Sequence, residues 1–305
     1  MKAIPALVLL LTAAAADAAG PVCDAQWKDM ARDGRIVPVR IRMPDGKDKA
    51  PVILFSHGLG GSIDSGRAWA EAWADAGFLV VNLQHPGSDR SIIGQGRLRD
   101  AMRPEQLIAR VEDVHFAIDR LEGGGREGAC DLSRADMSRI GMSGHSYGAH
   151  TTQAIAGQRF PFAGGDRLAD RRVRAAIAFS PSPPVRESPE AAFAGVSIPF
   201  LSITGTADSV PITPWVKPMD RLVPFQAMPA GGKYLLVLDG ANHMAFNGRG
   251  DRAYGGEALT PHMEDVVDKA TIAFWRWTLM GDARARRVLD EKALPLSGSD
   301  KLQRR

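Results

Sequence analysis

A serine between two glycines is the feature that most constrains the fold of this 305-residue chain. The pentapeptide Gly144-His145-Ser146-Tyr147-Gly148 follows the stretch 137–142, which we predict to be a strand, and precedes the segment 149–156, which is rich in small residues. Glycines on both sides of the serine permit a sharp, strained turn and close packing against its neighbours. We therefore expect a strand, a tight turn and a helix in that order, with the Ser146 hydroxyl held clear of a sheet.

Short apolar runs alternate with segments of helical periodicity along most of the chain. Strands are predicted at 36–43, 51–55, 78–83, 137–142, 173–179, 200–204 and 234–238. Helices are predicted at 69–76, 107–121, 149–156 and 265–279. This alternation predicts an α/β fold with a mostly parallel central sheet and helices on both faces. Ligands of such sheets bind beyond the carboxyl ends of the strands, so the segments after the strands are the candidates for a site.

The first residues have the pattern of a secretory signal peptide, which we place at 1–18. Lys2 precedes the apolar run 4–11, and an Ala-Asp-Ala cleavage sequence follows at 16–18, with Ala14-Ala15-Ala16 as the alternative. The run is too short to span a membrane as a helix. We therefore expect an exported protein, periplasmic or secreted.

The remaining chain is predicted to be one catalytic domain, 19–281, followed by a basic tail. No linker or internal repeat divides the domain, and no insertion is long enough for a large cap. Residues 282–305 are rich in lysine and arginine, and we expect them to be solvated. The net charge is only +3, with basic and acidic residues interspersed, which argues against a nucleic-acid-binding surface. No later apolar run approaches about 20 residues, so no stable membrane insertion is expected.

Cys23 and Cys130 are the only cysteines of the chain. In an oxidising compartment they are expected to form one disulfide, and two unpaired thiols are the alternative. The bond would join the start of the mature chain to the loop before the strand that carries Ser146. Neither cysteine lies in a nucleophile motif, and no metal-ligand spacing or phosphate-binding loop occurs. We therefore expect no metal and no cofactor.

A serine hydroxyl needs a general base before it can act as a nucleophile at neutral pH. Of the seven histidines, His243 is the strongest candidate, because it lies between the last predicted strand and the last predicted helix. Asp208 follows the strand 200–204 and is expected to orient His243. Asp239, in the turn just before His243, is the alternative. The chain order Ser146, Asp208, His243 is that of a catalytic triad on an open α/β sheet.

The oxyanion formed during acyl transfer needs two backbone N–H donors. Tyr147, directly after the candidate nucleophile, is expected to supply one, and Leu59, in the glycine-rich loop 56–61, the other. His57 of the same loop is a candidate for shaping the loop or contacting substrate, and less so for a second base. Trp215, in a proline-rich segment, is a candidate for the wall of the substrate pocket or for ordinary packing.

These motifs resemble the α/β-hydrolases, and more narrowly the branch similar to dienelactone hydrolases and platelet-activating-factor acetylhydrolases. The resemblance covers most of the mature chain and rests on 35–40 with Pro44, 51–61, 84–89, 144–148, 205–208 and 240–243. It implies a serine esterase that acts on short or oxidised acyl esters, with the roles already given for the triad and the oxyanion donors. Dienelactone hydrolases themselves use a cysteine nucleophile, so Ser146 argues against that reaction.

The expected function is hydrolysis of small or short-acyl carboxylic esters through an acyl-enzyme on Ser146. The expected partner is a small-molecule or polymeric ester. A cutinase-like polyester hydrolase, an amidase and a lipid-acting acetylhydrolase are the alternatives on the same fold. A binding protein that keeps the scaffold without catalysis is the alternative outside the enzymes.

Overall fold

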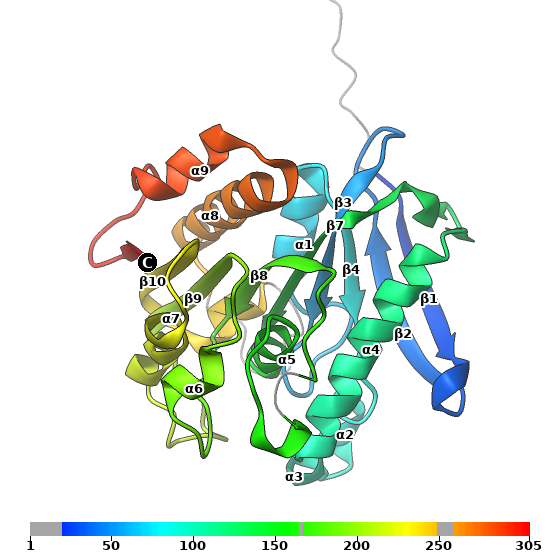
Figure 1. The fold of residues 1–305 in the computed structure, drawn as a ribbon, viewed down its shortest axis with the longest axis horizontal. Helices are drawn as coiled ribbons and strands as arrows, with labels where there is room; N and C mark the ends of the chain where they lie inside the picture. Colours follow the sequence, from blue (N-terminus) through cyan, green and yellow to red (C-terminus); the bar gives the residue numbers. More distant parts are fainter. Residues whose placement is uncertain (1–19, 165–166, 249–258) are drawn as a thin grey trace, which may run out of the picture.

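The computed structural model describes residues 20–164, 167–248 and 259–305, so the predicted signal peptide lies outside the described residues. Within them, the centre of the molecule is a nine-stranded sheet in the order β1-β2-β4-β3-β7-β8-β9-β10-β11 (Figure 1). Its strands are β1 Val22–Asp29, β2 Arg35–Arg42, β3 Ala50–Ser56, β4 Leu79–Leu83, β7 Ala135–His145, β8 Val173–Phe179, β9 Phe200–Ala207, β10 Lys233–Asn242 and β11 Lys301–Arg304. A separate two-stranded ribbon pairs β5, Arg126–Glu127, with β6, Cys130–Asp131.

The six central strands, from β4 to β10, pair in parallel, while β1, β2 and β11 join the sheet antiparallel. The prediction of a mostly parallel sheet is therefore confirmed. The α-helices are α1 Arg67–Asp75, α2 Ser91–Gly94, α3 Leu98–Ala101, α4 Pro104–Glu122, α5 Tyr147–Ile155, α6 Pro189–Phe193, α7 Val223–Ala227, α8 Pro261–Met280 and α9 Ala283–Asp290.

Helices cover both faces of the sheet because successive strand residues point to opposite sides. Ile53 of β3 packs into the core beneath α1 and α8, while its neighbours Val52 and Leu54 pack into the core beneath α4. The continuous apolar sequence of β3 thus reflects burial on both faces. None of the helices in the described ranges is long and apolar enough to cross a membrane.

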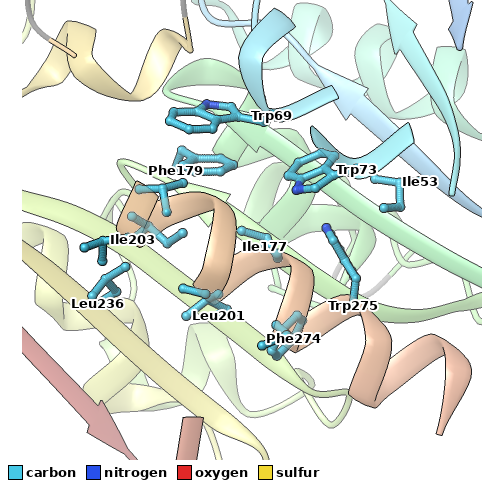
Figure 2. Close-up of a cluster of buried hydrophobic side chains, with 14 of the residues drawn as sticks. Ile53, Trp69, Trp73, Ile177, Phe179, Leu201, Ile203, Leu236, Phe274 and Trp275 are labelled. Carbon is cyan, nitrogen blue, oxygen red and sulfur yellow. The ribbon is translucent and has the colours of Figure 1, made fainter. Parts of the chain in front are cut away.

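Aromatic side chains fill the core between the sheet and the helices α1 and α8 (Figure 2). Trp69 of α1 stacks on Phe179 of β8, with ring centroids 5.5 Å apart, and Trp73 meets Trp275 of α8 edge-on at 5.8 Å. A Cβ atom on Gly141 of β7 would lie 2.6 Å from the Trp275 ring. The strand that leads to Ser146 is therefore held directly against this aromatic cluster.

The basic segment 282–305, expected to be a solvated tail, is instead part of the folded domain. Ala285 and Leu289, four residues apart, bury one face of α9, and Leu302 is buried in β11. β11 pairs antiparallel with β10 at the edge of the sheet, with Leu236 opposite Leu302. The expectation was wrong because the many charged residues of the segment lie on its exposed face and suggest a solvated tail. A few buried apolar residues are enough to hold it against the domain.

The predicted disulfide between Cys23 and Cys130 is present. It joins β1, an edge strand that the sequence analysis did not identify, to the ribbon strand β6. Cys130 is fully buried beside β2. The bond therefore fastens the first edge of the sheet to the segment that precedes β7.

Candidate active site

Ser146 lies in the tight turn between β7 and α5, in a backbone conformation that L-residues seldom adopt. Its φ and ψ are 56° and −111°, a strained region that is found mainly at functional sites. The two flanking glycines are required by contact. A Cβ atom on Gly148 would lie 1.9 Å from the carbonyl oxygen of Ser56, and one on Gly144 would lie 2.4 Å from the carbonyl oxygen of Gly148. The turn therefore packs against the end of β3, as the G-x-S-x-G spacing predicts.

Hydrogen bonds connect Ser146, His243 and Asp208 at the carboxyl ends of three strands. His243 opens a short 3₁₀ helix after β10, and its Nε2 lies 2.8 Å from Ser146 Oγ. Its Nδ1 lies 2.7 Å from Oδ1 of Asp208, which follows β9. Thr204 Oγ1 donates to the other carboxylate oxygen of Asp208 at 2.7 Å. An ionised carboxylate only accepts, so Nδ1 donates and Nε2 is left to accept the serine proton.

Asp208 is fully buried, yet it is held ionised. Burial alone raises the pKa of this carboxyl, but the hydrogen bond from His243 and the charges of His243 and Arg221 together bring it down to about 2. Arg221 Nε lies 3.2 Å from Asp208 Oδ1, and both side chains are buried. Arg221 is also tied to the carbonyl oxygen of Ser180 by a 3.1 Å hydrogen bond. No local pattern in the sequence marks Arg221 as a site residue, because only the folded chain brings it to Asp208.

His145, the second residue of the pentapeptide, supports His243 from behind. Its Nε2 donates to the main-chain carbonyl of His243 at 2.9 Å, and the two rings lie 4.7 Å apart. Burial, and then the proximity of His243, lower the pKa of His145 well below its usual range. A neutral ring so placed fixes the backbone of His243 without placing a second positive charge beside it.

A cavity of about 400 Å³ opens over Ser146 and His243. Its walls are the loop 58–61, the segment 209–212 after Asp208, Leu98 of α3, and residues from the 3₁₀ helix that starts at His243. Leu59 lies on this wall. Within the described residues its N–H has no backbone hydrogen-bond partner, whereas the N–H of Gly60 bonds the carbonyl of Ser88 at 2.8 Å. The Tyr147 N–H is the first of α5, where no intrahelical acceptor exists.

Three residues singled out in the sequence do not line this cavity. His57 is fully buried and accepts a hydrogen bond from the N–H of His85, a position that shapes the loop and does not face substrate. Trp215 is 69% exposed and lies outside the wall, which the residues directly after Asp208 form instead. The alternative acid Asp239 is exposed and accepts from Thr206 Oγ1.

A buried cation, Arg110 of α4, lies behind the loop 58–61. Its Nη2 donates to Ser56 Oγ at 2.9 Å and to the carbonyl oxygen of His57, and its Nη1 donates to Ser88 Oγ at 2.8 Å. The guanidinium also lies 4.6 Å from the centre of the Tyr147 ring. Burial lowers the pKa of Arg110 to about 10, so it is charged at neutral pH. One cation therefore contacts both the start of the loop 56–61 and the side chain of the residue that follows Ser146.

A second Ser–His–Asp chain lies beneath the first and is fully buried. Ser56 Oγ is 2.9 Å from His85 Nε2, and His85 Nδ1 is 3.0 Å from Asp113 Oδ2. Arg35 clamps Asp113 with two hydrogen bonds, of 2.7 and 2.9 Å. None of these side chains borders the cavity over Ser146, so the chain is structural.

Comparisons with known proteins agree with this fold. The family model of platelet-activating factor acetylhydrolase, isoform II, matches residues 38–119, from β2 into α4. No curated protein matches the chain. Among solved structures, a ferulic acid esterase from Streptomyces cinnamoneus is similar, with a TM-score of 0.61 and 19% identity over 95% of this chain and 98% of that chain.

These findings confirm the α/β-hydrolase fold and the resemblance to the acetylhydrolase branch over the matched segment. That segment contains the loop 58–61 but none of Ser146, Asp208 and His243. The assignment of these three residues as a candidate triad therefore rests on their hydrogen-bond distances in the structure. Within the described residues, no group of three or more His, Cys, Asp or Glu could hold a metal ion.

Proposed function

Because the chain has the α/β-hydrolase fold and resembles the acetylhydrolase branch, we propose that it is a serine hydrolase of carboxylic esters. Ser146 is the nucleophile, His243 the general base and Asp208 the orienting acid. The observation that carries this proposal is the hydrogen-bonded chain from Ser146 Oγ to Asp208, with contacts of 2.8 and 2.7 Å, which opens into a cavity at the serine end.

In the first half of the reaction, Ser146 Oγ attacks the ester carbonyl carbon while His243 Nε2 takes the serine proton. The ionised Asp208 stabilises the resulting imidazolium through Nδ1. Collapse of the tetrahedral intermediate breaks the bond to the alcohol, and His243 donates its proton to the departing oxygen. In the second half, water gives a proton to His243 and attacks the acyl-enzyme. Collapse of the second intermediate breaks the bond to Ser146 Oγ, His243 returns its proton to that oxygen, and the acid is released.

The oxyanion of both intermediates is held by the N–H groups of Leu59 and Tyr147. In the part of the chain that the structure describes, neither N–H has a backbone acceptor, which supports this role because an oxyanion hole requires donors that are free before the reaction. Arg110 holds the peptide between His57 and Gly58 in place through its bond to the His57 carbonyl. Its buried positive charge also favours negative charge developing nearby.

The size and apolar walls of the cavity favour small or short-acyl esters. A polymeric ester is a second candidate, because the segment after Asp208 exposes three large apolar side chains. Ile212 is 40%, Trp215 69% and Met219 78% exposed, and Ile212 also lines the cavity. Exposed apolar side chains on the segment that follows Asp208 favour contact with an insoluble chain. Release of soluble acid from polyester film by the wild type and by Trp215→Ala tests this candidate.

The direct test of the proposed function is covalent labelling with a fluorophosphonate, followed by intact mass measurement. The wild type should gain one adduct, and Ser146→Ala should gain none. Ser138→Ala, which removes an exposed serine from the same strand, is the matched control and should label like the wild type. A folded wild type without an adduct would contradict the triad and favour a binding protein. If the wild type is labelled, its rates of hydrolysis of an ester and of the matching amide are then compared. Faster hydrolysis of the ester indicates an esterase, and faster hydrolysis of the amide an amidase.

A further inference from the structure

A second cavity, of about 600 Å³, lies on the other side of the nucleophile turn. Ser146 faces the first cavity, whereas Tyr147 and His150, from the first turn of α5, line the second. Leu98, the first residue of α3, lines the first cavity. Met102, four positions later and just after α3, lines the second. Four residues of helix rise by about 6 Å. The two cavities are therefore separated by little more than one helical turn.

The charged residues around the second cavity are mainly arginines. Arg103, Arg159 and Arg186 line it, with Glu187 as the only acidic residue of the lining. Arg103 is paired with Asp100 at 3.2 Å, whereas in the described part of the chain no carboxylate lies within salt-bridge distance of Arg159 or Arg186. A guanidinium group offers paired N–H donors that match the two oxygens of a carboxylate.

Two polar atoms at this cavity are buried without a partner. The Tyr147 hydroxyl and Glu187 Oε2 have no hydrogen bond within the described residues. Buried polar groups in folded proteins are nearly always paired, so such atoms at a cavity wall call for an explanation. An acceptor on a bound ligand would satisfy the Tyr147 hydroxyl, whereas Glu187 Oε2 requires a donor, which a carboxylate does not offer.

Much of the remaining lining is apolar, and several of these apolar side chains are exposed. Phe160 and Phe162 pack with ring centroids 5.4 Å apart. Met102, Phe162 and Val185 are 41%, 46% and 72% exposed, although all three are large hydrophobic residues. Apolar side chains gathered at one cavity and left open to solvent indicate a ligand with an apolar body.

We propose that the second cavity binds the arm of an ester substrate that ends in a carboxylate, so that the preferred substrates are half-esters of dicarboxylic acids. The apolar part of the arm packs on Phe160 and Val185, and the carboxylate meets Arg159 and Arg186. Because Leu98 and Met102 place the two cavities about one helical turn apart, one extended molecule would have to cross only that distance to occupy both. This inference rests on the proposed function, because it assigns a substrate class to the same nucleophile.

The test compares three 4-nitrophenyl esters of equal chain length: the octanoate, the suberate half-ester, and an octanoate analogue that ends in phosphate. The measured quantity is kcat/KM for each anionic ester divided by kcat/KM for the octanoate. Arg159→Gln/Arg186→Gln removes the two arginines of the cavity that have no carboxylate partner among the described residues. The matched control is Arg171→Gln/Arg174→Gln, which removes two exposed arginines at the opposite end of the parallel sheet, at the start of β8.

The wild type should prefer the suberate half-ester, and the cavity variant should lower that preference about five- to tenfold, since each exposed ion pair contributes modestly. The control should change it less than twofold. An unchanged preference in the cavity variant, with Ser146 still labelled by fluorophosphonate, overturns the second site alone. A wild type that is neither labelled nor active overturns the proposed function as well. Tenfold faster turnover of the phosphate-ended ester than of the suberate half-ester would overturn the assignment to a carboxylate.

Discussion

Three fully buried histidines should make the protein markedly less stable in mild acid. His57, His85 and His145 have no exposed surface or nearly none. Burial is the main cause that lowers the pKa of each, helped by Arg110 at His57 and His85 and by His243 at His145. The pKa of His85 falls to about 4. Below the ordinary histidine pKa of about 6.5 the unfolded chain binds these protons and the folded chain does not. The free energy of unfolding must therefore fall as the pH falls.

The size of the effect follows from the unfolded pKa for each histidine whose ring stays neutral in the folded protein at pH 5. At pH 5 the solution is about 1.5 units below the unfolded pKa, and one unit corresponds to about 1.4 kcal/mol, so each histidine costs about 2 kcal/mol. The three together should cost about 6 kcal/mol between pH 7 and pH 5. That is a large share of the roughly 5–15 kcal/mol that stabilises a typical domain.

Urea unfolding at pH 7 and pH 5, followed by the fluorescence of the six tryptophans, measures this difference. His57→Gln removes one of these groups and should reduce the loss by about 2 kcal/mol, whatever its effect on stability at pH 7. A loss below about 2 kcal/mol in the wild type would refute the reasoning, because it would require at least two of these histidines to accept protons inside the folded protein.

Other predictions concern the disulfide, the triad and the buried cation. Cys23→Ser/Cys130→Ser opens a loop with a sequence separation of 107, and the free energy of unfolding measured in urea should fall by about 4–5 kcal/mol; a loss under about 1 kcal/mol would contradict the loop-entropy argument. Asp208→Asn should lower kcat by roughly 10³- to 10⁴-fold, since an amide cannot hold the required tautomer of His243; a loss under about tenfold would remove Asp208 from the triad. Arg110→Met should lower kcat about 10- to 100-fold with little change in KM, as expected when an oxyanion loop loses its support, and Arg110→Lys should recover part of it. A folded Arg110→Met variant with unchanged kcat would show that the loop does not depend on this cation.

The sequence predicted those parts of the fold and site that have local signals. Ser146 is identified by its flanking glycines, and the central strands by continuous apolar runs. Residues whose role depends on distant contacts have no such signal. Arg221 looks like any charged residue of a proline-rich segment until the fold places it on Asp208, and Arg110 occupies a helical position that periodicity alone assigns to either face. The prediction for residues 282–305 was wrong for a related reason. Burial of a few leucines against the domain and pairing of β11 with the edge of the sheet fix the segment despite its many charged residues.

The buried chain Ser56–His85–Asp113 provides an internal comparison for the candidate triad. Both chains join the same residue types with contacts of 2.7–3.0 Å. They differ in backbone strain and in access, because Ser146 has a left-handed φ and borders a cavity, while Ser56 lies in a regular strand and is sealed. A template that matches only three residue types and two distances would select both. The features that set the candidate triad apart therefore lie in the surrounding glycines and loops. Transplanting the three side chains alone into another sheet is expected to reproduce the hydrogen bonds without the chemistry.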